Sequence, residues 1–158
     1  SHNEASLDTW IPLEFTENMV YGEKAAAFSE WTKGLRAELR RESITTGIIV
    51  MNPEPSSFAT LFDNKLEPEV YSFGMLRMLI EAAGREGITD YPVHIKIDTG
   101  MHRLGFLPQE IPALVEVLKQ QNALTPRSIF SHFAGSDSPL FDDFSKQQHA
   151  LFNTAAED

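Results

Sequence analysis

Three ionisable side chains alternate with apolar ones in the segment from residue 93 to residue 98. They are His94, Lys96 and Asp98, and each is preceded by an apolar residue, a valine or an isoleucine. Because the side chains of a strand point alternately to its two faces, a strand here places an imidazole, an amine and a carboxylate on one face. Such groups can bind anions or transfer protons. Alternation alone also fits an antiparallel strand with one face in water.

Two further residues stand where strands end. Arg103 follows the turn that begins at Thr99-Gly100, and its planar guanidinium can hold a carboxylate or phosphate through two parallel bonds. His132 ends the segment 127–132, in which it shares a face with Ser128. Ligands of parallel α/β folds bind at the carboxyl ends of strands. Arg103 and His132, together with Lys96, are therefore the candidate site residues.

Metal and nucleotide chemistry find no support in the sequence. It contains no cysteine, and His94 and His132 have no further ligand at a spacing typical of metal sites. No phosphate loop or dinucleotide fingerprint occurs. We therefore expect no metal.

The elements that must position these residues alternate along the chain. Helical apolar spacing in residues 22–42 predicts an amphipathic helix, with strand-helix units after it. Strands are predicted over 47–51, 68–72, 93–98 and 127–132, and helices after a cap at Ser56 or Ser57 and over 73–86, 108–121 and 142–156. About four such units predict an α/β fold with a parallel sheet covered by helices. The alternation itself fits an open sheet or a barrel.

Composition limits the kinds of partner. The 158 residues suit one domain, and 42% are hydrophobic, as in a globular protein. A net charge of -10 argues against nucleic acid and anionic membranes as partners. No apolar run reaches the roughly 18 residues that span a bilayer, and the start of the chain shows no signal segment. The lack of cysteine favours a reducing compartment, so we expect a cytoplasmic protein.

Residues 93–106 closely resemble the central motif of alanine racemases, and residues 131–134 resemble the next strand end of that family. Asn52-Pro53 and residues 66–73 add to the likeness, which is greatest to the form fused behind a muropeptide ligase. The resemblance covers about residues 37–158, which we interpret as a partial barrel. Residues 1–36 form a lead-in segment with a helix that the motifs do not match.

The resemblance implies a fold-type III pyridoxal-phosphate enzyme, with an eight-stranded α/β barrel, a following β domain and a homodimeric assembly. Such enzymes interconvert L- and D-alanine for cell-wall peptidoglycan. By resemblance, Lys96 matches a carbamylated lysine that orients the arginine. Arg103 matches the arginine that contacts the phenolic oxygen of the cofactor and the substrate carboxylate. His132 matches the histidine packed against the pyridine ring.

The sequence also departs from the family pattern. Glu17 falls where the family has its Schiff-base lysine. The second strand of the family, its last two strands and the β domain that carries the catalytic tyrosine have no counterpart. We therefore expect a fragment that is inactive alone and binds the cofactor weakly or not at all. Its Lys96 is expected to be unmodified, either paired with Asp98 or turned to solvent. We also expect a homodimer that joins two half-barrels. The alternative is a non-catalytic interaction or structural fragment with a vestigial site.

Overall fold

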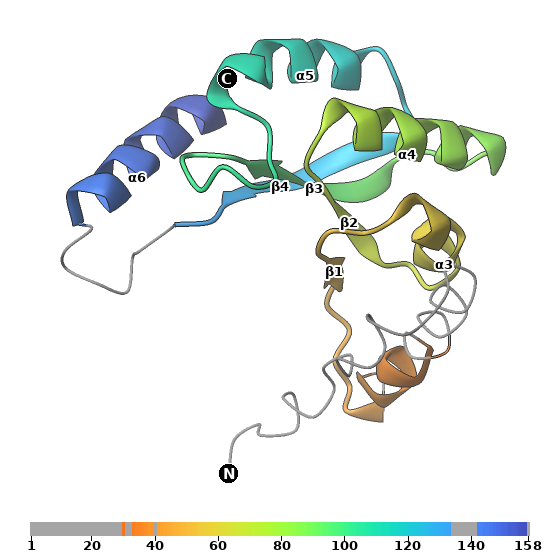
Figure 1. Ribbon diagram of the computed structural model, residues 1–158. Coiled ribbons are helices and arrows are strands. Elements are labelled where there is room, and N and C mark those ends of the chain that lie inside the picture. Colours follow the sequence, from red (N-terminus) through yellow and green to blue (C-terminus); the bar gives the residue numbers. More distant parts are fainter. Residues whose placement is uncertain (1–29, 31–32, 40, 134–141, 158) are drawn as a thin grey trace.

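The computed structural model describes residues 30, 33–39, 41–133 and 142–157 (Figure 1). Within them one sheet has the strand order β1-β2-β3-β4, with every neighbouring pair parallel. Its strands are β1 (Ile49–Val50), β2 (Glu67–Val70), β3 (Tyr91–Ile97) and β4 (Leu124–Ser131). The helices are α3 (Phe58–Asp63), α4 (Phe73–Arg85), α5 (Ile111–Lys119) and α6 (Asp142–Glu157), with short 3-10 turns η1 (Pro55–Ser57) and η2 (Pro108–Glu110).

Strands that follow one another in the chain are also neighbours in the sheet, and helical segments connect them. Figure 1 shows α4, α5 and α6 on one side of the sheet, as in the wall of a barrel. The predicted α/β class and partial barrel of four parallel strand-helix units are confirmed. Residues 33–39 are helical, within the helix predicted for 22–42, and most of the remainder of that range lies outside the described residues.

The helix starts are only partly as predicted. Ser57 precedes α3 but does not cap it, because its hydroxyl donates to the carbonyl of Glu54 at 2.6 Å. Ser72 is the serine that caps a helix, since its hydroxyl accepts from the backbone N–H of Met75 at 3.2 Å. This cap fixes the start of α4 directly after β2, at the end of the sheet where the site residues lie.

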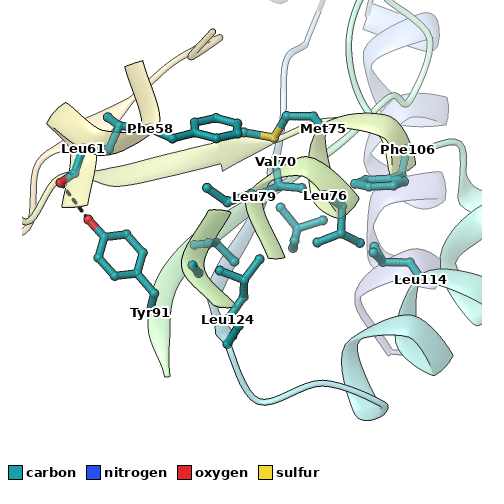
Figure 2. Packing of buried hydrophobic residues seen from close by; sticks show 14 of the residues in the cluster. Phe58, Leu61, Val70, Met75, Leu76, Leu79, Tyr91, Phe106, Leu114 and Leu124 are labelled. Atoms are coloured by element: carbon teal, nitrogen blue, oxygen red, sulfur yellow. Dashed lines mark hydrogen bonds between the residues drawn. The ribbon is translucent and has the colours of Figure 1, made fainter. Parts of the chain in front are cut away.

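The core lies between the sheet and its helices (Figure 2). Val93, Ile95 and Ile97 of β3 are at most 2% exposed, so this face of the strand points to the helices. They pack in one cluster with buried residues of α4 and α5, among them Leu76 and Leu114. The opposite face of β3 must then carry His94 and Lys96, as the alternation predicts.

Tyr91 closes the core at the start of β3. Its hydroxyl lies 2.8 Å from the carbonyl oxygen of Leu61 and 2.6 Å from that of Leu66, so one proton serves two acceptors (Figure 2 shows the first contact). Burial, and to a lesser extent the nearby Glu67 carboxylate, raise the pKa of Tyr91 well above its ordinary value of 10.0.

The raised pKa of Tyr91 predicts a loss of stability in alkali. The folded chain keeps the phenolic proton above pH 10, whereas the unfolded chain releases it, so the free energy of unfolding falls as pH rises above about 10, by at most about 1.4 kcal/mol per pH unit. Urea unfolding between pH 8 and pH 11 measures this. Tyr91→Phe should show a smaller fall, with the part due to Tyr71, whose pKa burial also raises, remaining. An equal fall in the variant would contradict the prediction.

Candidate functional site

The face of the sheet opposite α4 and α5, here called the inner face, carries polar side chains from three strands. Glu69 of β2 and Ser128 of β4 both lie in register with His94 of β3. Lys96 lies in register with Phe130. Neighbours in register point to the same face of a parallel sheet. The inner face therefore brings together acids of β2 and bases of β3.

Lys96 pairs with Glu69, not with Asp98 as we expected. Its Nζ lies 3.2 Å from Glu69 Oε1, and the two side chains are 16% and 1% exposed. The contact is an ion pair whose geometry falls short of a hydrogen bond. Glu69 Oε2 accepts the backbone N–H of Asn52 at 2.5 Å. A carboxylate from the neighbouring strand reaches the amine because β2 lies directly beside β3.

Asp98 instead shapes the loop that carries Arg103. One of its oxygens accepts the backbone N–H groups of Gly100 at 3.0 Å and His102 at 3.1 Å. The loop closes where the N–H of Asp98 donates to the carbonyl of Phe106, and the N–H of Phe106 donates to the carbonyl of Lys96, both at 2.8 Å. Both ends of the loop are thus fixed to the end of β3.

Lys96, Arg103 and His132 line one small hollow of about 10 Å³ at the ends of β3 and β4. The structure therefore brings together the three residues that the sequence singled out. Arg103 also lines a larger hollow of about 380 Å³, bounded by Tyr71 and the start of α4. Arg103 and His132 are exposed, so both can contact a ligand.

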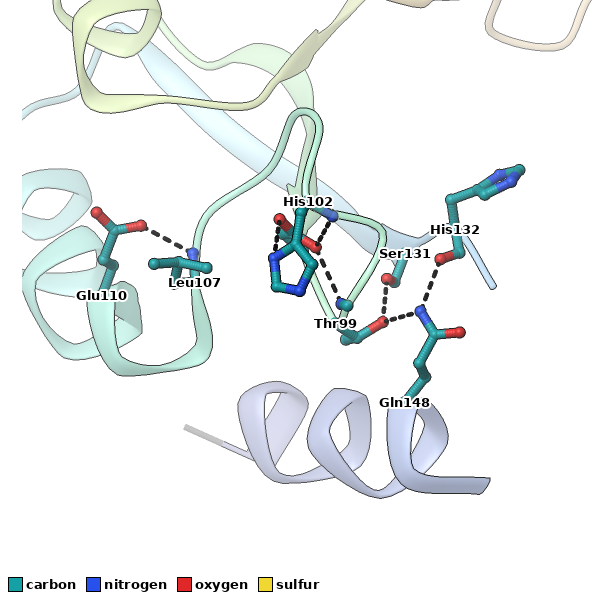
Figure 3. Close-up of polar contacts among 9 residues, drawn as sticks. Thr99, His102, Leu107, Glu110, Ser131, His132 and Gln148 are labelled. Atoms are coloured by element: carbon teal, nitrogen blue, oxygen red, sulfur yellow. Dashed lines mark hydrogen bonds and ion pairs between the residues drawn. The ribbon is translucent and has the colours of Figure 1, made fainter. Parts of the chain in front are cut away.

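A polar cluster ties the ends of β3 and β4 to α6 (Figure 3). The hydroxyls of Thr99 and Ser131 lie 2.7 Å apart. Gln148 of α6, which is fully buried, donates to the Thr99 hydroxyl at 3.3 Å and to the carbonyl of His132 at 3.2 Å. The imidazole of His132 points away from this cluster (Figure 3). The cluster holds the backbone of His132 and leaves its ring accessible.

Sequence reasoning missed three polar residues of this region: Glu67, Glu69 and Gln148. Glu67 and Glu69 lie two positions apart in a short buried strand, which is the spacing that identified His94 and Lys96. That pattern was a usable signal. Gln148 gave a weaker one, because two adjacent glutamines in a helix of mixed polarity do not show which of them is buried.

A second cluster lies on the inner face, nearer the start of the strands. Glu67 Oε2 lies 2.6 Å from His94 Nε2, and Glu67 Oε1 lies 2.8 Å from Arg127 Nη1. The other ring nitrogen of His94, Nδ1, lies 2.6 Å from the hydroxyl of Ser128. Among the described residues, no three His, Asp or Glu side chains are placed to hold a metal ion.

The residues at the strand ends fit pyridoxal phosphate only in part. The guanidinium of Arg103 and the imidazole of His132 are exposed, so both can contact a flat anionic ring. The hollow between them, however, has room for about one water molecule. Within the described part of the chain, the lysine that lines it is Lys96, whose amine is paired with Glu69. These residues alone do not fit a covalently held cofactor, and we derive no chemical step through one.

A parallel sheet with helices on one side, and with ionisable groups where β3 and β4 end, defines part of an α/β-barrel protein whose ligand site lies at the carboxyl ends of its strands. The sequence matches the family described as "Alanine racemase, N-terminal domain" over residues 6–158. The chain belongs to this family. The match begins well before residue 37, where the motifs begin.

Relatives agree with this assignment. The chain is 35% identical over 130 residues to an alanine racemase of Nitratidesulfovibrio vulgaris, which covers 81% of this chain and 34% of the relative. A solved alanine racemase of Clostridium difficile 630 has a TM-score of 0.67 at 27% identity, covering 78% of this chain and 33% of the other. A solved histidine racemase of Leuconostoc mesenteroides has a TM-score of 0.66 at 21% identity, and the match covers 79% of this chain and 34% of that protein. At this identity the match supports the fold alone. The chain thus spans about a third of these proteins. None of the helices in the described part could cross a membrane.

Proposed function

We propose that the chain supplies one half of a pyridoxal-phosphate barrel that interconverts L- and D-alanine for cell-wall synthesis in the cytoplasm. The observation that carries the proposal is the single hollow lined by Lys96, Arg103 and His132 at the ends of β3 and β4. Family membership supports the substrate class. The motifs support a relation to the form fused behind a muropeptide ligase, and the lack of cysteine supports the cytoplasm.

We assign each of the three residues a role that its surroundings support. Arg103 is exposed on a loop fixed at both ends, so its guanidinium can bind a substrate carboxylate without ordering the backbone first. His132 presents its ring to a flat partner. Lys96 places a positive charge beside Arg103 and His132, and Glu69 fixes the amine through their 3.2 Å ion pair. These roles extend the resemblance to residues of this chain.

The isolated chain is expected not to racemise alanine. Covalent catalysis needs an amine free to react, and Lys96, the one lysine among the described residues that line the hollow, is ion-paired. L-alanine with added pyridoxal phosphate should yield D-alanine no faster than a protein-free blank, as measured with a D-amino-acid oxidase assay. Arg103→Ala is the matched control and should give the same blank rate. Turnover above the blank that Arg103→Ala abolishes would contradict the prediction.

A non-catalytic interaction or structural role is the second candidate. It is favoured by the small size of the hollow and by the ion pair that holds the Lys96 amine on Glu69. Titration with the cofactor separates the two functions. A new absorbance band from lysine-bound cofactor would support an enzyme site, whereas an unchanged spectrum of free cofactor supports the non-catalytic role.

We expect the chain to form a homodimer, because the four parallel strands of the described part cannot close a barrel that needs about eight. Much of the outer strand β4 is exposed, with residues 125–128 all open to solvent. A two-fold assembly of two such sheets would cover the outer edges of β1 and β4 together with the inner faces. Light scattering over a micromolar concentration series should give twice the chain mass. A constant mass of 17.7 kDa would show a monomer instead.

A further inference from the structure

A line of hydrogen-bonded side chains crosses the inner face from β2 to β4 and takes no part in the proposed function. Glu67 contacts His94, and His94 contacts Ser128, with 2.6 Å at both steps. Glu67 and His94 are each only 7% exposed, whereas Ser128 is exposed. A buried acid, a buried imidazole and an accessible hydroxyl therefore stand in sequence.

The sheet register produces this arrangement. His94 lies opposite Ser128, and the pairing of β3 with β4 is irregular between Val93 and His94, so that the register passes from Pro126 to Ser128. Arg127, the residue passed over, donates from Nη1 to Glu67 Oε1 at 2.8 Å. The irregularity thus brings Ser128 within hydrogen-bond distance of His94 and Arg127 within hydrogen-bond distance of Glu67.

For a neutral His94 ring and an ionised Glu67, the partners select one tautomer. Glu67 receives Arg127 on one oxygen and His94 on the other, and a carboxylate can only accept. His94 Nε2 therefore carries a hydrogen, which leaves Nδ1 of the neutral ring as an acceptor. The Ser128 hydroxyl must then donate to Nδ1. This is the order of groups in a serine nucleophile activated by a histidine base that an acid orients.

From this geometry we propose that Ser128 is a nucleophile toward small activated carboxylic esters, with His94 as its base and Glu67 as the residue that positions His94. Ser128 Oγ bonds to the carbonyl carbon, its proton moves to His94 Nδ1, and the alcohol leaves with that proton as the ester C–O bond breaks. Water then attacks the acyl carbon and gives a proton to His94. Ser128 recovers this proton as the carboxylic acid departs, so no oxidant or reductant is needed.

The test uses p-nitrophenyl acetate as the probe on the intact chain. Release of p-nitrophenol is followed by absorbance, and the acetylated residue is located by peptide mass mapping. We expect acetyl on Ser128, at least a tenfold loss of release above background in Ser128→Ala, and about a 10²-fold loss in His94→Gln. Ser56→Ala, in the turn η1 outside this cluster, should match the unaltered chain. Circular dichroism confirms that each variant is folded.

Glu67→Gln keeps the volume and an acceptor oxygen, so it tests the positioning role even where His94→Gln does not fold. The release rate is also measured as a function of pH for the unaltered chain and for Glu67→Gln, with Glu67, Arg127 and Glu69, which lies in register with His94, as the charged groups near this line of residues. Glu67→Gln should shift that profile, which a purely structural role would not do. A folded chain with no acetyl on Ser128, or equal labelling and an equal profile in Glu67→Gln, would overturn the proposal.

Discussion

Glu69→Ala is expected to lower the free energy of unfolding by about 3 kcal/mol, the low end of the range for removing one partner of a buried ion pair. The Glu69 side chain is 1% exposed and serves two groups, the Lys96 amine and the Asn52 backbone N–H. Without it, Lys96 keeps a charge in a site with 16% exposure, and the N–H loses its acceptor. Urea unfolding monitored by circular dichroism measures the difference.

Glu81→Ala is the matched control for this prediction. Glu81 also pairs with a cation, Arg85, at 3.4 Å, but both side chains are 70% exposed. Exposed pairs of this kind contribute up to about 0.5 kcal/mol. Glu69→Gln keeps an acceptor for Asn52 and removes only the charge, so it should fall between the two. If Glu69→Ala were as mild as Glu81→Ala, the ion pair would have no part in stability.

Gly105→Ala is expected to cost about 3 kcal/mol or more, because two effects add at this position. Gly105 has a φ of +137°, which residues with a side chain rarely adopt, and a Cβ here would lie 2.7 Å from the backbone nitrogen of Asp98. That nitrogen donates to Phe106, so relieving the clash opens the base of the Arg103 loop. Urea unfolding measures the loss.

Two other glycines separate these effects. Gly84 lies inside α4. Apart from the backbone of its own helix, no atom of the described residues lies within 4 Å of an added Cβ, so Gly84→Ala should be neutral or stabilising by up to about 1 kcal/mol. Gly87 has a φ of +67° and the same open space, so Gly87→Ala reports the backbone cost alone. Equal losses in Gly87→Ala and Gly105→Ala would mean that the contact with Asp98 has no effect.

The sequence predicts the elements well because their signals are local. Alternation over residues 93–98 identifies β3, which spans Tyr91–Ile97, and helical spacing over 73–86 identifies α4, which spans Phe73–Arg85. The ends are less well defined. β1 is predicted over 47–51 but pairs only at Ile49–Val50. The length of the paired region depends on how far the neighbouring strand extends, and the sequence of β1 alone does not predict this.

The residues of the candidate site could also be predicted from local signals, whereas the contacts between them could not. Lys96, Arg103 and His132 are recognisable because each stands at or beside a strand end, where ligands of parallel folds bind. The partner predicted for Lys96, Asp98, was wrong, because the ion pair with Glu69 depends on the register between β2 and β3. The irregularity that places Ser128 on His94 also has no local signal. Contacts between strands are decided by tertiary packing, which a single sequence does not reveal.

The strand ladder also orders the local opening of the molecule. β1 is held to β2 by two residue pairs, whereas β3 is paired on both sides and matches β4 along its whole length. In amide hydrogen exchange, β1 should open at low free energy, and the amides of β3 should exchange last. The fixed ends of the Arg103 loop belong to this slow unit, through the N–H groups of Asp98 and Phe106. Fluctuations that detach Asn52 from Glu69 would therefore leave the Arg103 loop assembled.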